Sequence, residues 1–137
     1  MKVADVYPKV REIIADVLVI DQEEISLNSR LITDLGAESI DFLDLVFQLE
    51  KEFKIKIPRG QLEKNARGDL AEDEFEKGGI ISASGLQALK NYLTEVPSEQ
   101  FKPNMKVNEI PMLFNVETFC KLVVAAKVQQ DTMETID

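Results

Sequence analysis

The residue in this chain best placed to do chemistry is Ser39, whose hydroxyl lies where a turn is expected to meet a helix. The preceding residues, 34 to 38, include Gly36, which permits backbone conformations that other residues avoid and so favours a turn. The first amides of a helix lack partners within it, and the helix dipole is positive there, so Ser39 is well placed to carry a phosphate ester. A serine at such a junction also serves as a simple N-cap, and that interpretation stays open here.

The segment from Ile40 to Phe53 is predicted to be the helix that positions Ser39. Its apolar residues recur at helical spacing: Ile40, Phe42, Leu43, Leu45, Val46, Phe47, Leu49 and Phe53. At about 100° per residue the polar side chains collect in one narrow sector: Asp41, Asp44, Gln48, Lys51 and Glu52. We therefore expect a bundle helix that is covered on most sides and exposes a single charged stripe to water.

The string DLGAESIDFLDL, followed by a helix that runs into EKEFKIKIP, resembles the phosphopantetheine attachment region of acyl carrier proteins. In that family the motif is usually Asp-Ser-Leu after a leucine-glycine turn, and here Glu38-Ser39-Ile40 stands in its place. The resemblance covers residues 3 to about 60 and, more weakly, the last helix. It implies that Ser39 bears 4'-phosphopantetheine as a covalent cofactor, and that the thiol of this arm holds acyl groups as thioesters in fatty-acid or other lipid biosynthesis.

Within that family, residues 41–44 and 52–58 look most like the specialised carriers that serve long-chain acylation of lipid A, the membrane anchor of lipopolysaccharide. The resemblance also implies a protein that enzymes act upon and that has no catalytic residues of its own. Two other functions remain open. One is an unmodified acidic helical module that binds a basic partner, and the other is a carrier for amino acids or polyketides.

Acidic residues concentrate around Ser39. Residues 21 to 54 hold nine acids against three bases and so account for −6 of the net charge of −9. Such a field repels nucleic acid and attracts basic protein surfaces, although a plain solvated helix face is the simpler interpretation of the stripe alone. We expect the phosphopantetheinyl transferase and the acyl-loading and acyltransferase enzymes to dock with basic surfaces on Glu38, Ile40, Asp41, Leu43 and Asp44.

Several kinds of site are excluded or not expected. The chain contains no histidine, which rules out Ser-His and Cys-His nucleophile pairs and histidine metal sites. The acids do not follow the EF-hand pattern, so no metal site is assigned. The longest apolar run is five residues, 122–126, against about 20 for a membrane helix. With no signal-peptide pattern and the single cysteine Cys120, we expect a cytoplasmic monomer in which Cys120 is a core residue.

The predicted fold is all-α: one domain over residues 1–137, an acyl-carrier-like four-helix bundle with an insert and one or two extra helices. The elements expected are a helix over 3–20, an ordered loop over 21–37, the Ser39 helix, a short helix near 61–66, and helices over 84–95 and about 116–129. The insert covers about 67–112, and its charged part, 67–79, is expected to be exposed and mobile. The helix over about 116–129 resembles the closing helix of the bundle, and the alternative is that the helix over 84–95 closes it.

The helix over 84–95 carries Leu86, Leu89 and Leu93 on one side and must bury that face, for which the bundle is the most available partner. Packing there would widen or cover a pocket for the acyl chain. The insert would otherwise only tether partner enzymes or decorate the surface.

Overall fold

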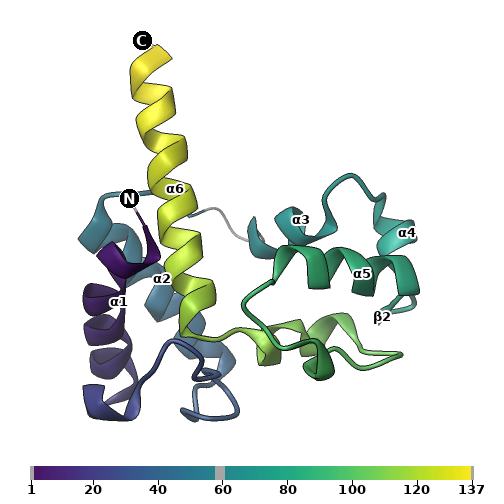
Figure 1. Cartoon of the computed structure of the whole chain (residues 1–137), viewed down its shortest axis with the longest axis horizontal. Coiled ribbons are helices and arrows are strands. Elements are labelled where there is room, and N and C mark those ends of the chain that lie inside the picture. The colour runs from purple at the N-terminus through teal and green to yellow at the C-terminus, as the bar shows by residue number, and fades with distance from the viewer. Residues whose placement is uncertain (1, 58–60, 137) are drawn as a thin grey trace.

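The computed structural model describes residues 2–57 and 61–136, without the side chains of Ser39, 61–63 and 131–136. It is mainly helical and has two lobes (Figure 1). The first lobe holds α1 (Val3–Leu18), η1 (Gln22–Glu24), α2 (Ser39–Phe53) and α6 (Val116–Ile136). The second holds α3 (Gln61–Arg67), α4 (Glu72–Phe75), β1 (Glu76–Lys77), β2 (Ile80–Ile81), α5 (Ala83–Tyr92), η2 (Ser98–Gln100) and η3 (Val107–Leu113). The predicted helical bundle with an insert and extra helices is confirmed.

The first lobe is built on α1, which packs along both α2 and α6. The two packed helices α1 and α2 run antiparallel: Lys9 of α1 forms an ion pair with Glu52 near the end of α2, at 3.4 Å, whereas Asp16, farther along α1, lines a pocket with Asp44, nearer the start of α2. Helical spacing places the buried residues on the facing sides: Val6, Val10, Ile13 and Ile14 of α1, Leu45 and Leu49 of α2, and Phe119 and Val123 of α6. The C-terminal end of α1 therefore lies beside the N-terminal end of α2.

The loop between α1 and α2 is held against the bundle by its apolar residues, as the sequence predicts. Ile25 and Leu31 are buried. The backbone N–H of Leu31 donates to the carbonyl of Phe114 at 3.1 Å, and that of Ala37 donates to the carbonyl of Leu31 at 2.8 Å. These contacts fix the turn that leads into α2.

Most of residues 67–79 are exposed, as predicted, but the segment is not without structure: it contains α4 and part of a two-stranded hairpin, with Phe75 buried. Its mobility stays a prediction. Gly85 lets α5 approach α4 closely, because a Cβ at Gly85 would lie 2.3 Å from the carbonyl oxygen of Phe75. The Ser82 hydroxyl donates to the carbonyl of Glu74 at 2.6 Å and accepts from the N–H of Gly85 at 3.0 Å. The buried ring of Phe75 and the bond from Ser82 to the Glu74 carbonyl hold this exposed, charged segment against α5.

The face of α5 also packs differently from the prediction. Leu89 and Leu93 are buried, but α5 packs mainly on α3 and α4, so the expectation that the bundle covers this face is wrong. The reason is that α3 and α4 are joined to α5 by short connections, so their apolar sides lie close enough to pack against the apolar face of α5.

The two lobes meet at a hydrogen-bonded joint after α5. The Glu95 side chain is 1% exposed and accepts from the Lys121 ammonium of α6 at 2.6 Å and from the Thr118 hydroxyl at 2.7 Å. The Asn115 side-chain amide donates to the Glu95 carbonyl at 3.3 Å. Through these bonds the second lobe is fixed to the first two turns of α6 and the residue before them.

Candidate functional site

Ser39 is the first residue of α2, at the junction that the sequence predicts. Its side chain lies outside the described part of the structure. Gly36 has φ +75, the left-handed conformation that turns the chain, and Glu38 is extended in the N-cap position. The N–H of Glu38 donates to an Asp41 carboxylate oxygen at 2.7 Å, so Asp41 closes the first turn of the helix. Because Gly36, Glu38 and Ile40 are all exposed, the junction lies at the surface.

The predicted docking residues gather on the first two turns of α2. Glu38, Ile40, Leu43 and Asp44 are exposed, and Asp41 is half-buried because it caps the helix. The structure thus brings all five together beside Ser39.

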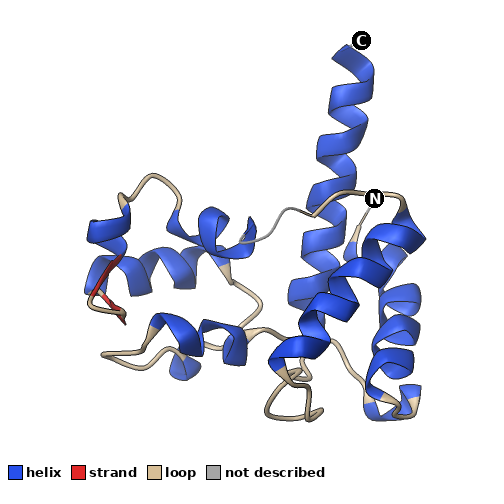
Figure 2. Ribbon diagram, turned by 180° about the vertical axis from the view of Figure 1, so that it is seen from behind, coloured by secondary structure: helices blue, strands red, loops and turns tan. Residues whose placement is uncertain are grey.

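The expectation that α2 shows only a charged stripe is wrong. Ile40 is 68% exposed, Leu43 is 56% exposed and Phe47 is 60% exposed. The reason is that α2 is packed on α1 and α6 while α3 packs on α5, so the side of α2 opposite its buried Leu45 and Leu49 is left uncovered. Figure 2, which views the molecule from behind, shows α2 at the front of the bundle. Sequence reasoning missed Phe47 as a surface residue, although it shares the sector of Ile40 and Leu43 at helical spacing.

An aromatic cluster lies on the inner side of the same helix. The Phe42 ring of α2 is 5.7 Å from the Phe119 ring of α6 and 6.2 Å from the ring of Phe114, the residue that follows η3. Phe114 and Phe119 meet edge to face at 6.2 Å. The chain that returns from the second lobe therefore contacts α2 directly, one turn beyond Ser39.

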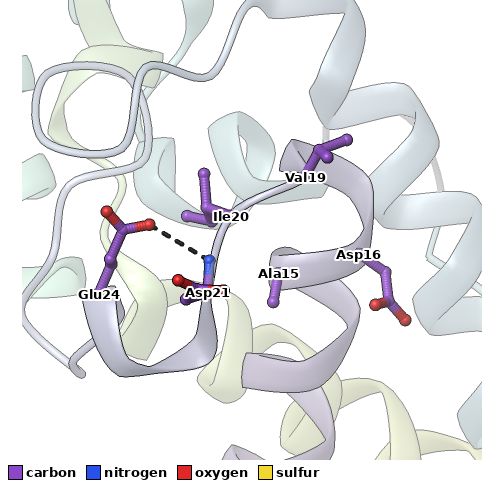
Figure 3. Close-up of a pocket in the computed structure, with 6 residues that line it drawn as sticks. All are labelled: Ala15, Asp16, Val19, Ile20, Asp21 and Glu24. Carbon is purple, nitrogen blue, oxygen red and sulfur yellow. Dashed lines mark hydrogen bonds between the residues drawn. The ribbon is translucent and has the colours of Figure 1, made fainter.

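A second group of acids lies at the C-terminal end of α1 (Figure 3). A shallow pocket there is lined by Ala15, Asp16, Val19, Ile20, Asp21 and Glu24. The N–H of Asp21 donates to a Glu24 carboxylate oxygen at 3.2 Å, and Val19 projects into solvent with 87% of its surface exposed. Asp16 also lines a neighbouring pocket with Asp44 of α2. These carboxylates add to the negative field at the Ser39 end of the bundle.

The described residues hold no group of three or more Cys, Asp or Glu side chains arranged to bind a metal ion. Cys120 is fully buried, and burial, with a smaller effect of the Glu117 charge, raises the pKa of its thiol to about 12. A thiol that stays protonated is a poor nucleophile, so Cys120 is a core residue. Over the ranges 2–57 and 61–136, no helix has the length and apolar character needed to cross a membrane.

The sequence matches the family described as "Phosphopantetheine attachment site" over residues 8–72. It is 43% identical over 76 residues to the acyl carrier protein AcpXL of Rhizobium meliloti (strain 1021), covering 55% of this chain and 80% of that protein. It is 49% identical over 66 residues to an acyl carrier protein of Clostridium acetobutylicum, covering 47% of this chain and 86% of the relative. With AcpXL of Mesorhizobium japonicum the identity is 52% over 52 residues, which cover 38% of this chain and 56% of the relative.

Proposed function

Because this chain belongs to the acyl carrier protein family, we propose that Ser39 bears its phosphopantetheine arm and that the protein carries acyl chains for the synthesis of lipid A or a similar envelope lipid. A carrier of this family is not an enzyme, and phosphopantetheine is its prosthetic group. The observation that carries the proposal is that the matched region contains Ser39 at the first position of α2. The other serines of that region, Ser26 and Ser29, have hydroxyls 3.0 Å apart that bond to each other in the loop.

The surroundings of Ser39 fit a phosphate ester. The N-terminal amides and the positive end of the α2 dipole favour a negatively charged group at this position. The exposed neighbours Glu38 and Ile40 leave the junction open to an incoming enzyme. When bound, the arm supplies a thiol that holds an acyl group as a thioester. The chain has no histidine to activate the Ser39 hydroxyl, so the transferase must supply the base.

Partner enzymes with basic surfaces dock on the first two turns of α2. Glu38, Asp41 and Asp44 provide the charge, and Ile40 and Leu43 provide the apolar contact. Phe47 extends the apolar surface by one further turn. Because exposed charges are screened within about 8 Å at physiological salt, the rate of transfer to Ser39 falls as salt rises. Asp44→Lys lowers this rate, and Asp69→Lys, an equal change of charge at an exposed site in the second lobe, leaves it unchanged. Equal rates for the two variants would refute the docking surface.

We also propose that residues 1–137 form one carrier domain in which about 67–112 is an insert and α6 is the closing helix. Support comes from the packing of α6 along α1 and α2, whereas α5 packs on α3 and α4. The insert returns to the bundle at Phe114, which contacts Phe42 next to the attachment site.

The lipid A assignment rests on the resemblance of residues 41–44 and 52–58 to carriers of that kind, and the similarity to proteins named AcpXL supports a specialised carrier. Burial of an acyl chain is favourable by about 0.8 kcal/mol per methylene, so a long chain benefits from the aromatic cluster where the segment after the insert returns to the bundle. Chemical shifts of the holo protein, charged with short and long acyl chains, test this role. A dedicated long-chain carrier shows changes at Phe42, Phe114 and Phe119 that grow with chain length, and changes confined to α1 and α2 would contradict it.

The attachment itself is tested by the intact mass of the protein after incubation with coenzyme A and a phosphopantetheinyl transferase. The wild type gains the mass of one phosphopantetheine group, and Ser39→Ala gains none. Ser84→Ala, which removes an exposed hydroxyl from the first turn of α5, is the control and is modified like the wild type. An unmodified wild type would instead favour an interaction module that carries no arm.

A further inference from the structure

The exposed face of α2 changes sign along its length. Its first turns carry Asp44 and the acids around Ser39, whereas its last turn and the residues that follow carry the exposed lysines Lys51, Lys54 and Lys56. These lysines border a groove with Phe47, Glu50 and Ile55, at the end of the helix farthest from Ser39. Glu50 accepts a hydrogen bond from the N–H of Ile57, and the exposed Glu52 pairs with Lys9 of α1, so the lysines give this part of the face its positive charge. The docking surface proposed for basic enzymes does not include these lysines, so the proposed function does not explain them.

The acidic and basic ends are spaced so that they complement each other in an antiparallel pair. If a two-fold axis crosses α2 between residues 47 and 48, residues whose numbers add to 95 lie opposite each other. This rule places Asp44 opposite Lys51, and both residues are exposed on this face. Each copy would therefore contribute its Asp44 to Lys51 of the other.

The apolar residues of the face lie at the centre of the same arrangement. Leu43, Lys54, Phe47, Ile40, Lys51 and Asp44 fall within a sector of about 100° at the helical angle per residue. Asp44 and Lys51 stand about 4.5 and 6 Å along the axis on either side of Phe47. Phe47, 60% exposed, would meet its counterpart near the axis, with Leu43, 56% exposed, beside it. An apolar centre between opposite charges is the usual anatomy of a protein interface.

We propose that a second copy of this chain binds to the α2 face, so that two molecules form a two-fold antiparallel pair through Phe47, Leu43 and the opposed charges Asp44 and Lys51. A two-fold pair needs one surface that complements itself, and this face meets that condition for both charge and apolar contact. An anionic lipid surface would fit the lysines but would be repelled by Asp44 and the acids at the other end. A single helix pair buries less than a stable dimer needs, so the pair has a Kd of about 0.1 to 1 mM. The protein is accordingly a monomer when dilute.

One consequence rests on the proposed function. The pair covers Ile40, Leu43 and Asp44, which partner enzymes use, and it places the partner copy beside Ser39. Self-association and enzyme docking then exclude each other. At high local concentration the paired form holds carriers out of reach of their enzymes.

Sedimentation velocity of the unmodified protein over a concentration series reaching about 1 mM tests the pair, with two reciprocal variants. Asp44→Lys sets a positive charge opposite Lys51 of the other copy, and Lys51→Glu sets a negative charge opposite Asp44, so neither variant should pair with itself. An equal mixture of the two restores both opposite-charge contacts, since Lys at 44 faces Glu at 51 and Lys51 faces Asp44. The controls are Asp69→Lys and Lys102→Glu, which make the same charge changes at exposed sites away from α2.

The expected result is an increase in sedimentation coefficient with concentration for the wild type and both controls, its loss in each α2 variant, and its return in the mixture. A wild type that stays monomeric throughout, or a mixture that stays monomeric while the wild type associates, would overturn the proposal. Binding of the monomeric wild type to phosphatidylglycerol vesicles would also overturn it and assign the lysines to a lipid surface. None of these measurements depends on Ser39. The proposal of the pair can therefore be refuted without refuting the attachment site, and the attachment site without refuting the pair.

Discussion

The joint between the two lobes makes the strongest prediction for a single substitution. Lys121→Met keeps the apolar stem of the side chain but removes the ammonium that lies 2.6 Å from the Glu95 carboxylate. Breaking a buried ion pair from one side costs about 3 to 5 kcal/mol, because a buried charge is left behind. The Glu95 side chain is 1% exposed, but the Lys121 side chain is 35% exposed, so water can enter from that side and partly replace the lost ammonium as a hydrogen-bond donor to Glu95. The Thr118 hydroxyl also remains, and we expect a loss of about 2 to 3 kcal/mol.

Urea unfolding of the unmodified protein, followed by circular dichroism at neutral pH, measures this loss. Lys127→Met is the matched control on α6 and should change the unfolding free energy by less than about 0.5 kcal/mol. Adding Glu95→Gln to Lys121→Met should recover part of the loss, because the unpaired charge is then gone. If Lys121→Met costs no more than Lys127→Met, or if the double variant loses the full sum of the single losses, the joint does not stabilise the fold as argued.

Three further predictions concern the core. Phe42→Ala should destabilise the protein by about 2 to 3 kcal/mol in the same urea assay, since it removes one ring of the aromatic cluster. Phe47→Ala, on the exposed side of α2, should cost less than about 0.5 kcal/mol. Equal effects of the two variants would contradict the burial assigned to the two sides of α2. Gly85→Ala should cost about 1 to 3 kcal/mol by forcing α5 away from α4, and amides of α4 and α5 should exchange faster with solvent than in the control Ser84→Ala. Burial raises the pKa of the Cys120 thiol from 9.0 to about 12. The contribution of the protonated thiol to the free energy of unfolding is therefore fully present below about pH 9 and is lost as pH rises toward 12. Alkylation of the native, unmodified protein near pH 8 should be about a thousandfold slower than in urea, and equal rates would refute the burial.

Much of the bundle follows from periodicity. The spacing of Val6, Val10, Ile13 and Ile14 predicts the buried face of α1, and the aliphatic residues of the following loop predict that it is ordered. Ser39 stands at the predicted loop-helix junction because Gly36 and the apolar pattern after Ser39 are both local signals. Here the local signals and the packing of the bundle agree, which is why the junction is predicted correctly.

The errors have a common physical origin, which is that periodicity identifies a face but not its partner. The apolar residues of α2 exceed what α1 and α6 cover, and the sequence does not say that α3 turns away to pack on α5. For the same reason, the sequence predicts the apolar face of α5 but wrongly assigns the bundle as the surface that covers it. Glu95 shows a further limit: nothing near it in the sequence marks it as buried, since its partners Thr118 and Lys121 lie more than 20 residues away.

The most direct test of the central claim is to locate the prosthetic group within the chain. Trypsin cuts after Arg30 and Lys51, and the peptide between them, residues 31–51, contains Ser39 as its single serine and Thr33 as its only other hydroxyl residue. After incubation with coenzyme A and a phosphopantetheinyl transferase, fragmentation of this peptide should place the phosphopantetheine mass on Ser39. The mass on Thr33, on any other peptide, or on no peptide under conditions that modify a control acyl carrier protein would contradict the assignment.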